Sequence, residues 1–454
     1  MYKKYHPRLR FVFISLIITI VITTNFSQIL ANKSMENENL NFSEEEKICN
    51  GYTLVAPRVG EPVYLIDMDG KAIHNWSIHG FSAKMLPNGT IIGSREILEE
   101  HNNFARGGAI YKYVSEEDWN GNITWEFNNW SEGWARQHHD LFREGNPEYY
   151  SPVQTTNSEG NTLILARTKK TVNKSISWMP LGDGVIYEVN QNGTLTGFEW
   201  HASEHFNEMG FDKRAKIGIY LYPAWQGWLH LNTCSEIGEN KWYEQGYNEF
   251  SPGNIITCSR HANFIAIINK TTGNIVWRIG PDYKEEPDNK LGKIIGPHNV
   301  HIIPKGLPGE GNMLLFDNGG IAGYDILGGF FYFPMRNIRF YSRIIEFNPI
   351  TKEIVWEYKE TGKGLSSIFG KNKFYSWVES SVQRLPNGNT LITEGTSGRV
   401  FEVTHEKEVV WEYYYEGPNK MYRDNFLYRA YRVPPEWIPG NPSNYTLWSS
   451  LYEN

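Results

Sequence analysis

The stretch SSVQRLPNGNTLITEGTSGRVFEVTHEKEVVWEY, residues 380–413, contains four short runs that are typical of β-strands. The runs are SSVQRL, NTLITE, RVFEVT and VVWEY, and turn residues separate them at Pro-Asn-Gly, Gly-Thr-Ser-Gly and His-Glu-Lys. Because such short turns connect neighbouring antiparallel strands, the stretch predicts one four-stranded antiparallel sheet. We call its strands first to fourth in chain order.

The same unit recurs along the chain, and a tryptophan marks its fourth strand each time. The marking residues are Trp76, Trp125, Trp200, Trp277, Trp356 and Trp411. Third strands such as RIIEFN and RVFEVT match one another, as do second strands such as NTLILART and NTLITE. Four-stranded sheets repeated around an axis bury their apolar faces against their neighbours. The sequence therefore predicts an all-β fold, a six-bladed β-propeller of four-stranded antiparallel blades, with two separate β domains as the alternative.

The first copy of the unit lacks its first strand, because GYTLVAP at residues 51–57 already matches a second strand. The segment LYRAYRVP, residues 427–434, has the character of a first strand, and we expect it to supply the missing one and close the ring. Residues 45–454 would then form one propeller domain. The length of 454 residues taken alone favours about three domains, but the repeats outweigh it.

Composition and charge limit the function. Aromatic residues make up 15% of the chain, which suits β-rich structure. The net charge is -7 with both signs spread along the chain, so no basic patch supports nucleic-acid binding, and we exclude that class. Cys49, Cys234 and Cys258 are too few for a disulfide scaffold. A single bridge between Cys234 and Cys258 is one interpretation, and two buried thiols is the other.

Residues 1–31 are typical of an export signal, with basic residues before the apolar run FVFISLIITIVIT and Ala31 near a cleavage point. The run is shorter than the ~18 residues that span a bilayer, which favours a cleaved signal peptide. Ile29 fits a cleavage site poorly, so an N-terminal membrane anchor is the alternative. We expect an exported protein that is periplasmic, at the cell surface or secreted.

Polar residues gather at two kinds of position that lie at the same end of an antiparallel sheet: the start of the first strand and the loop from the second to the third. The first strands begin with His139 and Asp140, with His230 and Asn232, and with His298 and Asn299. The loops carry Arg95, Arg167, Arg260, His261, Asp317, Asn318 and Arg399. We expect these side chains at one mouth of the channel, binding an anionic small molecule, with rim salt bridges as the alternative.

The motif GPHNVHIIP, residues 296–304, contains two histidines at an odd spacing. On an extended strand His298 and His301 would point to opposite sides. We expect His298, beside the Gly-Pro corner, to line the channel and His301 to be buried between blades. Opposite faces cannot chelate one zinc ion, and the chain has no cysteine cluster, so neither a metal nor another cofactor is predicted.

Several segments, taken in order, resemble the arylsulfotransferase family. They include HHDLFREGNPEYY, WLHLNTC, CSRHANFIAIINKTTGNIVWRIGPDY, FDNGG and RLPNGNTLITEGTSGRVFEV. The family consists of exported six-bladed propellers that move a sulfuryl group from one phenol to another without the nucleotide sulfate donor. The resemblance implies that an imidazole attacks sulfur and is transiently sulfated, that a further histidine handles the phenol proton, and that Arg and Asn hold the sulfonate.

By this resemblance His230 and His298 match the family's substrate-binding histidines, and we expect them to act in catalysis on aryl sulfates and phenols. The expected substrate-binding residues are Arg399, Asn318, Asn232, His139 and Arg260. The family's nucleophilic histidine is expected where this chain has Arg399, and Gly320 follows the Asp-Asn-Gly turn where an arginine is common. Either His298 or His230 attacks, or transfer is direct, with Arg399 holding the sulfonate. The alternative is a non-catalytic extracytoplasmic propeller that binds anionic aromatic ligands.

Overall fold

The computed structural model describes the part of the chain that carries the predicted repeats. The described residues are 47–58, 61–97, 111–128, 130–131, 134–135, 137–146, 148–153, 159–168, 174–224, 227–284, 290–326, 337–360, 374–418 and 425–452. The chain divides into residues 1–47 and residues 48–454. The predicted signal peptide or anchor, residues 1–31, lies outside the described residues. Within them, no helix has the length and apolar character needed to cross a membrane.

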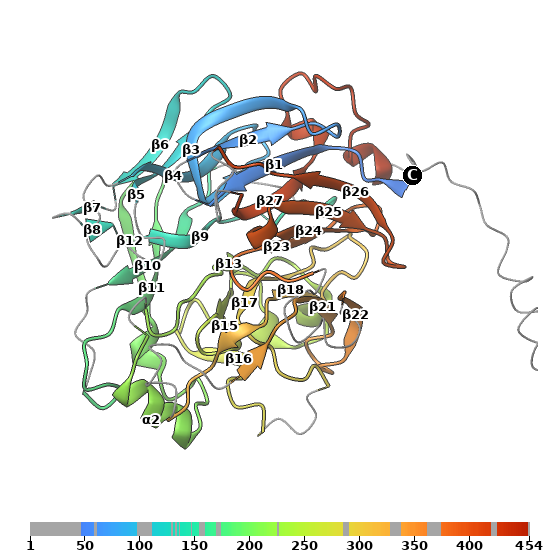
Figure 1. Ribbon diagram of the computed structural model, residues 1–454. Coiled ribbons are helices and arrows are strands. Elements are labelled where there is room, and N and C mark those ends of the chain that lie inside the picture. The colour runs from blue at the N-terminus through green and yellow to red at the C-terminus, as the bar shows by residue number, and fades with distance from the viewer. Residues whose placement is uncertain are drawn as a thin grey trace, which may run out of the picture. The chain divides into compact units, whose positions relative to one another are not determined.

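The largest sheet has seven antiparallel strands in the order β27-β1-β2-β3-β4-β5-β6 (Figure 1). Its strands are β27 (Leu427–Val433), β1 (Tyr52–Pro57), β2 (Pro62–Ile66), β3 (Ala72–Met85), β4 (Ile91–Ile97), β5 (Tyr111–Glu117) and β6 (Ile123–Asn128). The long strand β3 is shared, because its first half pairs with β2 and its second half pairs with β4. The sheet therefore contains two four-stranded sets, and β27 pairs with β1 as the predicted first strand of one of them.

Four further antiparallel sheets have four strands each. The first consists of β9 (Gln137–Arg143), β10 (Thr162–Thr168), β11 (Asp183–Val189) and β12 (Leu195–His201), and the second of β13 (Ser235–Glu236), β14 (Ile255–Ser259), β15 (Phe264–Ile268) and β16 (Ile275–Ile279). The third consists of β17 (Pro297–Ile302), β18 (Met313–Asp317), β21 (Arg343–Phe347) and β22 (Ile354–Tyr358). The fourth consists of β23 (Ser381–Arg384), β24 (Thr390–Glu394), β25 (Arg399–Val403) and β26 (Val409–Tyr414). The predicted all-β fold of four-stranded antiparallel sheets is confirmed.

Short elements complete the described chain. Two small hairpins pair β7 (Trp130–Ser131) with β8 (Trp134–Ala135) and β19 (Gly320–Ala322) with β20 (Asn337–Arg339). The helices are α2 (Lys213–Leu221) and α3 (Lys241–Glu244), with 3-10 turns η3 (Ala202–His205), η4 (Asn248–Phe250), η7 (Gly395–Ser397), η8 (Pro435–Trp437) and η9 (Ser449–Tyr452). Helices are thus a small part of the fold.

One side chain shapes the turn between the third and fourth strands in five of the sets. The turns begin with Asp67, Asp118, Asn190, Asn269 and Asn348, whose side-chain oxygens accept a hydrogen bond from the backbone N–H two residues later at 2.8–3.1 Å. Asp and Asn stabilise turns in this way because the side chain imitates a backbone acceptor. The repeat is therefore built into the turns as well as into the strands.

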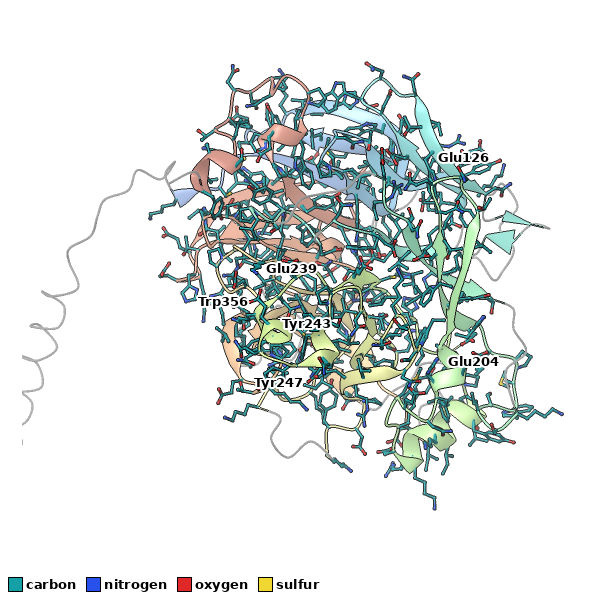
Figure 2. The ribbon with its side chains drawn as sticks, turned by 180° about the vertical axis from the view of Figure 1, so that it is seen from behind. Glu126, Glu204, Glu239, Tyr243, Tyr247 and Trp356 are labelled. Carbon is teal, nitrogen blue, oxygen red and sulfur yellow. The ribbon has the colours of Figure 1, made fainter. Side chains whose placement is uncertain are left out.

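All six marking tryptophans lie on the fourth strand of a set, as predicted. Four of their indoles donate a hydrogen bond to a backbone carbonyl in the turn of the following set: Trp125 to Asn190 at 3.1 Å, Trp200 to Gly273 at 2.8 Å, Trp356 to His405 at 2.8 Å, and Trp411 to Met68 at 2.8 Å. Side chains fill the space between the strands of the ribbon (Figure 2). One buried apolar cluster joins Val114 of one set to Ile164 and Val185 of the next. Each sheet is thus joined to its neighbour by apolar contacts and by a repeated hydrogen bond.

The three cysteines are all buried free thiols, which selects the second of the two interpretations of Cys234 and Cys258. The sulfur of Cys258 lies 2.9 Å from Oδ1 of Asn232. Burial raises the pKa of the Cys258 thiol to about 12, so the thiol is neutral and unreactive at neutral pH.

Candidate functional site

Five histidines from three consecutive sheets come together. The histidine group consists of His138, His139, His230, His261 and His298. The ring centroids of His139 and His230 are 4.6 Å apart, and those of His230 and His261 are also 4.6 Å apart. His298 is close enough for its charge to lower the pKa of both His139 and His261. The predicted convergence of first strands and loops therefore brings together His139, His230 and His298, with His138 and His261 beside them.

Arg167 and Arg260 supply positive charge to the histidine group. Nη2 of Arg260 lies 3.4 Å from the carbonyl oxygen of Trp377, and its Nε is buried without a hydrogen-bond partner among the described residues. In this part of the chain, no carboxylate lies within ion-pair distance of Arg260. Burial lowers the pKa of Arg167 and of Arg260 to about 10. Both guanidiniums stay charged at neutral pH, and that of Arg260 can still bind an anion.

The imidazoles of the group are neutral. Burial, and then the charge of Arg260, lowers the pKa of His298 and that of His261 to about 3. Burial and the surrounding histidines hold the pKa of His139 and of His230 well below the usual value. A neutral imidazole has an unprotonated nitrogen, which is what a nucleophile or a general base requires.

Hydrogen bonds fix the tautomer of His298. Nδ2 of Asn318 donates to the carbonyls of Ser376 at 2.8 Å and Glu379 at 2.9 Å, so its Oδ1 faces Nδ1 of His298 at 2.7 Å. The carbonyl of Gly296 is also 3.0 Å from that Nδ1. Because both neighbours are acceptors, Nδ1 carries the proton, and Nε2 accepts from the backbone N–H of Glu379 at 3.3 Å. Asn318 therefore orients His298 and is not placed to hold a sulfonate.

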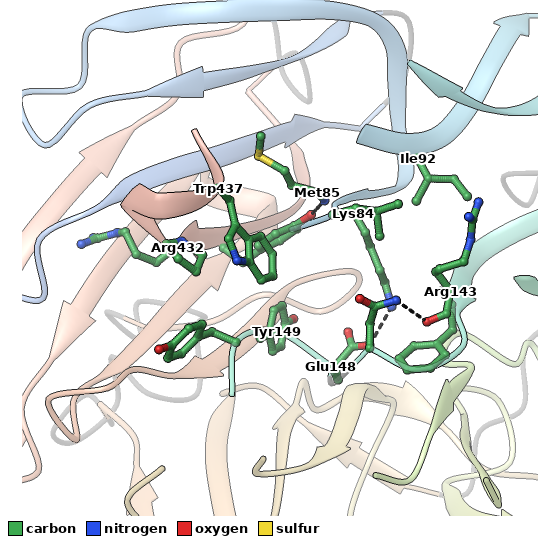
Figure 3. Close-up of a pocket in the computed structure, with 14 residues that line it drawn as sticks. Lys84, Met85, Ile92, Arg143, Glu148, Tyr149, Arg432 and Trp437 are labelled. Carbon is green, nitrogen blue, oxygen red and sulfur yellow. Dashed lines mark hydrogen bonds and ion pairs between the residues drawn. The ribbon is translucent and has the colours of Figure 1, made fainter. Parts of the chain in front are cut away.

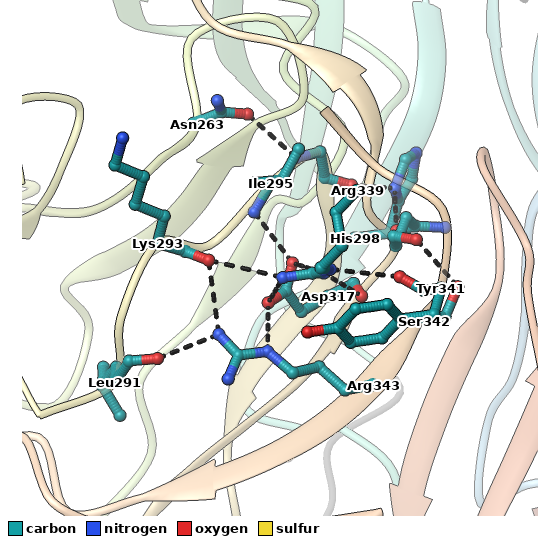
Figure 4. A network of polar contacts seen from close by, with 12 residues as sticks. Asn263, Leu291, Lys293, Ile295, His298, Asp317, Arg339, Tyr341, Ser342 and Arg343 are labelled. Carbon is teal, nitrogen blue, oxygen red and sulfur yellow. Dashed lines mark hydrogen bonds and ion pairs between the residues drawn. The ribbon is translucent and has the colours of Figure 1, made fainter. Parts of the chain in front are cut away.

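Asp317 anchors the backbone in front of His298 (Figure 4). Its carboxylate pairs with Arg339 at 2.6 Å and Arg343 at 2.7 Å, and accepts from the backbone N–H of Ile295 at 2.8 Å. Burial alone would raise the pKa of Asp317, but the two guanidiniums hold it below the usual value. The carboxylate is therefore ionised, and its role is structural.

The structure does not bring Arg399 into the histidine group. Its Nε and Nη2 lie 3.0 Å from Oε2 of Glu412 on the next strand, and its guanidinium covers the ring of Phe401. Arg343 stands at the same position of the preceding sheet, where its Nη1 lies 3.1 Å from Glu357. Arg399 thus repeats a structural ion pair. Its predicted role in holding the sulfonate stays a prediction, and this geometry favours the alternative of a rim salt bridge.

Asn232 is also engaged within the fold. Its Nδ2 donates to the carbonyl of Pro297 at 2.8 Å, and its own carbonyl accepts from Arg429 at 2.9 Å. These bonds join the sheet of β14 to β17 and to β27. The expected role of Asn232 in binding substrate finds no support in this arrangement.

The expectation that His298 and His301 face opposite sides was wrong. His298 lies opposite Phe316 and His301 lies opposite Leu314, so the two residues between the histidines on β17 face only one residue of β18. This bulge contains Asn299, whose φ is +49°. A bulge breaks the alternation of a strand, so both histidines lie on one face at different depths. His301 is buried farther along β17, with its ring 5.1 Å from that of Tyr149.

Left-handed residues occur where several first strands begin. The φ angles are +62° at His139, +51° at His230, +49° at Asn299, +60° at Glu379 and +86° at Ser380. Such conformations cost non-glycine residues about 1 to 3 kcal/mol each and gather at functional sites. Left-handed non-glycine residues also occur in turns elsewhere, such as Lys352 and Lys407, but two of them, His139 and His230, belong to the histidine group.

Beyond the histidines, along the same first strands, charged groups neutralise one another (Figure 3). Lys84 lies 2.7 Å from Glu148 and 3.3 Å from Asp140, which in turn lies 3.0 Å from Arg429. A cavity beside Lys84 and Glu148 has a volume of about 40 Å³. Since one water needs about 10–15 Å³, this cavity has room for a few waters and not for an aryl sulfate.

Residues missed by sequence reasoning complete the group. Tyr428 donates its hydroxyl proton to the carbonyl of His139, and the backbone N–H of Glu379 reaches His298. Both residues start a first strand, in LYRAYRVP and in ESSVQRL, so alignment of the repeats would have found them. His138 was missed because an alternating strand would turn it away from His139. No three His, Cys, Asp or Glu side chains in the described ranges are placed to hold a metal ion.

The sequence matches the model of the family described as Arylsulfotransferase (ASST) over residues 31–431. No curated protein matches. Similar solved structures include a protein of unknown function from Bacteroides caccae (13% identity, 84% of this chain and 98% of that chain, TM-score 0.44). Others are apo AztD from Citrobacter koseri (10%, 84% and 98%, 0.39) and virginiamycin B lyase from Staphylococcus aureus (10%, 81% and 82%, 0.36).

Proposed function

The chain belongs to the arylsulfotransferase family, and from that premise we propose that it transfers a sulfuryl group from aryl sulfates to phenols without a nucleotide donor. The observation that carries the proposal is a group of neutral imidazoles beside Arg260, whose guanidinium has no carboxylate within ion-pair distance among the described residues. An anionic sulfonate fits next to that guanidinium, and an unprotonated imidazole nitrogen fits the attack on its sulfur.

His230 is the histidine best placed to attack. It is partly exposed, its ring lies between those of His139 and His261, and its Nδ1 has no hydrogen-bond partner in the described chain. His298 is less suited, because its unprotonated Nε2 already accepts from Glu379. In the proposed step a lone pair of His230 forms an N–S bond, and the S–O bond breaks with its electron pair leaving on the donor phenolate. The acceptor oxygen then forms a new S–O bond and the N–S bond breaks.

We also propose that the sets of strands form a closed propeller of six blades. The pairing of β27 with β1 and the hydrogen bond from Trp411 to Met68 support closure, because each links the C-terminal part of the repeat to its N-terminal part. The predicted export and the signal peptide or membrane anchor at residues 1–31 remain part of the proposal. Mass spectrometry of the mature N-terminus from exporting cells tests them, because an uncleaved chain would contradict a cleaved signal.

Turnover of 4-nitrophenyl sulfate with a phenol acceptor tests the activity. His230→Asn should lower turnover by about 100-fold or more, the scale of a lost catalytic group. His301→Asn is the matched control, since it removes a buried histidine of the same channel that lies away from Arg260, and it should keep most of the activity. A sulfated peptide containing residue 230 should be trapped from the wild type alone. Equal losses in both variants would contradict the assignment.

The second candidate function is binding of anionic aromatic ligands without turnover. It is favoured by the ion pair of Arg399 with Glu412, because the position expected for the family's nucleophile holds a structural arginine. Saturable binding of 4-nitrophenyl sulfate, with no phenol released and no sulfated peptide, would establish this function in place of the first.

A further inference from the structure

The sequence Asn-X-Ser/Thr is the acceptor motif for N-linked glycans, which are attached to exported proteins and lie on their surface. Beyond residue 31 the chain contains ten such sequences in which X is not proline, and the structure describes the surroundings of six of them. The other four lie outside the described residues, at Asn32, Asn41, Asn129 and Asn173. The six are at Asn75, Asn88, Asn122, Asn192, Asn269 and Asn444.

Two of the six asparagines have a structural role. Oδ1 of Asn269 accepts a hydrogen bond from the backbone N–H of Thr271 at 3.1 Å and from that of Thr272 at 2.9 Å. Oδ1 of Asn88 accepts from the backbone N–H of Thr90 at 3.2 Å and from its hydroxyl at 2.8 Å. Asparagine is common in turns because its side chain accepts such bonds. Since Asn269 is only half-exposed and Thr90 is buried, neither motif is fully open to solvent.

In the remaining four motifs both the asparagine and the hydroxyl residue are exposed. We call these motifs the exposed acceptors. They are Asn75 with Ser77, Asn122 with Thr124, Asn192 with Thr194, and Asn444 with Thr446. The exposure matters because a glycan is attached to Nδ2 of the asparagine and must extend into solvent.

Turn structure does not explain the asparagines at 122 and 192. The turn at Asn192 is shaped by Asn190, whose Oδ1 accepts from the backbone N–H groups of residues 192 and 194. Asp118 shapes the turn at Asn122 in the same way. Nδ2 of Asn122 also donates to Asp118 at 2.9 Å, and a glycosylated amide keeps one N–H for this bond. The side chain of Asn192 makes no hydrogen bond within the described residues.

The same comparison separates the other two exposed acceptors. Asn75 lies within strand β3, where asparagine is an uncommon residue. Asn444 has a φ of +51°, which asparagine tolerates better than most residues, so its backbone supplies a second reason for this residue type. The motifs at Asn75, Asn122 and Asn192 are therefore the ones that the fold explains least.

The exposed acceptors at Asn122 and Asn192 lie at the end of the sheets away from the histidine group. The histidines lie where first strands begin and in loops from second to third strands. In an antiparallel sheet the turn from the third to the fourth strand is at the opposite end. Asn122 and Asn192 lie in two such turns, which begin at Asp118 and Asn190.

The other two exposed acceptors lie beside a third turn of the same kind, which begins at Asp67. Asn75 follows this turn directly, since β3 begins at residue 72. The residue after Asn444 is Tyr445, whose hydroxyl accepts from the backbone N–H of Met68 in the turn at 2.9 Å. All four exposed acceptors are therefore at the same end of their sheets.

We propose that the exposed acceptors carry N-linked glycans, which cover the end of the sheets opposite the histidine group and leave the histidine end uncovered. This rests on the proposed export, because the sugar donor, a lipid-linked oligosaccharide phosphate, is used outside the cytosol. In the modification Nδ2 forms a bond to the first sugar carbon and loses one proton. The bond from that carbon to the phosphate oxygen breaks, and its electron pair leaves on the phosphate.

The first test is mass spectrometry of peptides from the full chain, purified from cells that export it. The four exposed acceptors should show sugar mass, and the peptides with Asn88 and Asn269 should show none. Thr194→Ala should remove the sugar from Asn192, whereas Thr194→Ser is the matched control, because serine also completes the motif. An exported chain whose four acceptors are all unmodified would overturn the proposal. A chain that is neither exported nor modified would overturn the export together with the glycans.

The second test concerns the position of the glycans. Substitution of all four acceptor asparagines by glutamine should leave the turnover of 4-nitrophenyl sulfate unchanged, because the glycans lie at the far end of the sheets. A loss of turnover with an unchanged midpoint of urea unfolding would contradict this placement. Absence of turnover in the wild type would contradict the sulfotransferase function, and the peptide masses would still decide whether the acceptors carry glycans.

Discussion

Replacement of Arg260 by methionine should stabilise the fold and weaken donor binding at the same time. Burial lowers the pKa of Arg260 from 12.5 to about 10, so the folded state binds this proton less tightly than the unfolded chain. At about 1.36 kcal/mol per pKa unit, the charged guanidinium costs the fold about 3 kcal/mol. The side chain is partly exposed, so we discount this cost to about 1 to 2 kcal/mol. The cost applies below pH of about 10 and vanishes towards 12.5.

Donor binding should change in the opposite direction. A charge-assisted hydrogen bond between guanidinium and sulfonate contributes about 1.5 to 3 kcal/mol, so its loss should weaken binding about 10- to 150-fold. The assay is calorimetric titration with 4-nitrophenyl sulfate at low temperature, together with urea unfolding with and without inorganic sulfate. Arg399→Met is the matched control: it removes the arginine that pairs with Glu412, which should cost at most about 1 kcal/mol and leave donor affinity unchanged.

Three results would refute this reasoning. If Arg260→Met is less stable than the wild type and binds the donor equally well, Arg260 is a structural residue and the anion site lies elsewhere. If Arg399→Met weakens donor binding and Arg260→Met does not, the sulfonate is held by Arg399, as the sequence resemblance first suggested. Unchanged donor affinity in both variants would show that neither Arg260 nor Arg399 holds the donor.

Three further predictions concern the scaffold. Deletion of residues 426–454 removes β27 and should abolish cooperative unfolding in urea, whereas a truncated chain that unfolds like the intact one would contradict its role as an integral strand. Trp411→Phe removes the hydrogen bond to Met68 and should lower the free energy of unfolding, measured in urea, by about 1 to 3 kcal/mol. The control is Trp277→Phe, because the Trp277 indole makes no such bond within the described residues, and its loss of stability should be smaller. Equal losses in the two variants would assign the effect to packing alone. The pKa of Asp317 is lowered in the folded state, so its carboxylate stabilises the fold above the unfolded pKa of about 4, and this contribution is lost as the pH falls further. Asp317→Asn should therefore be less stable than the wild type at pH 7, and the difference should shrink as the pH falls below about 4.

The four-stranded sheets could be predicted from the sequence because the residues that indicate them are close in the chain and recur in each repeat. The tryptophan of each fourth strand and the Asp or Asn that opens the preceding turn recur at fixed places within the unit. Both residue types act within a few residues or on the neighbouring sheet, so a pattern in one repeat is confirmed by the next. The same argument explains the pairing of β27 with β1, since the missing first strand left one segment with the right character.

The site was only partly accessible, for two physical reasons. The first reason is a repeated ion pair, which joins Arg343 to Glu357 and Arg399 to Glu412. The sequence shows each arginine at the rim but does not show that a glutamate already neutralises its charge. The second reason is the bulge at His298, because strand parity holds for regular backbone and fails where an extra residue is inserted. The ion pair leaves no sequence signal in a single chain, and Asn299, a residue type that tolerates a positive φ, is only a weak signal for the bulge.

The strain itself explains why the histidines can meet. A regular first strand turns only every second side chain towards one face, which allows one histidine from the start of each strand to reach the histidine group. Left-handed residues at 139, 230 and 299 change the direction of the chain there, so adjacent residues such as His138 and His139 lie on the same side. At about 1 to 3 kcal/mol each, these residues together cost a large part of the 5 to 15 kcal/mol that stabilises a typical domain. The bonds that hold them include Tyr428 to the carbonyl of His139 and Tyr149 to Oδ1 of Asn299 at 2.9 Å. Apolar contacts between sheets do not require this strain, so its presence at His139 and His230 is consistent with the proposed role of the histidine group.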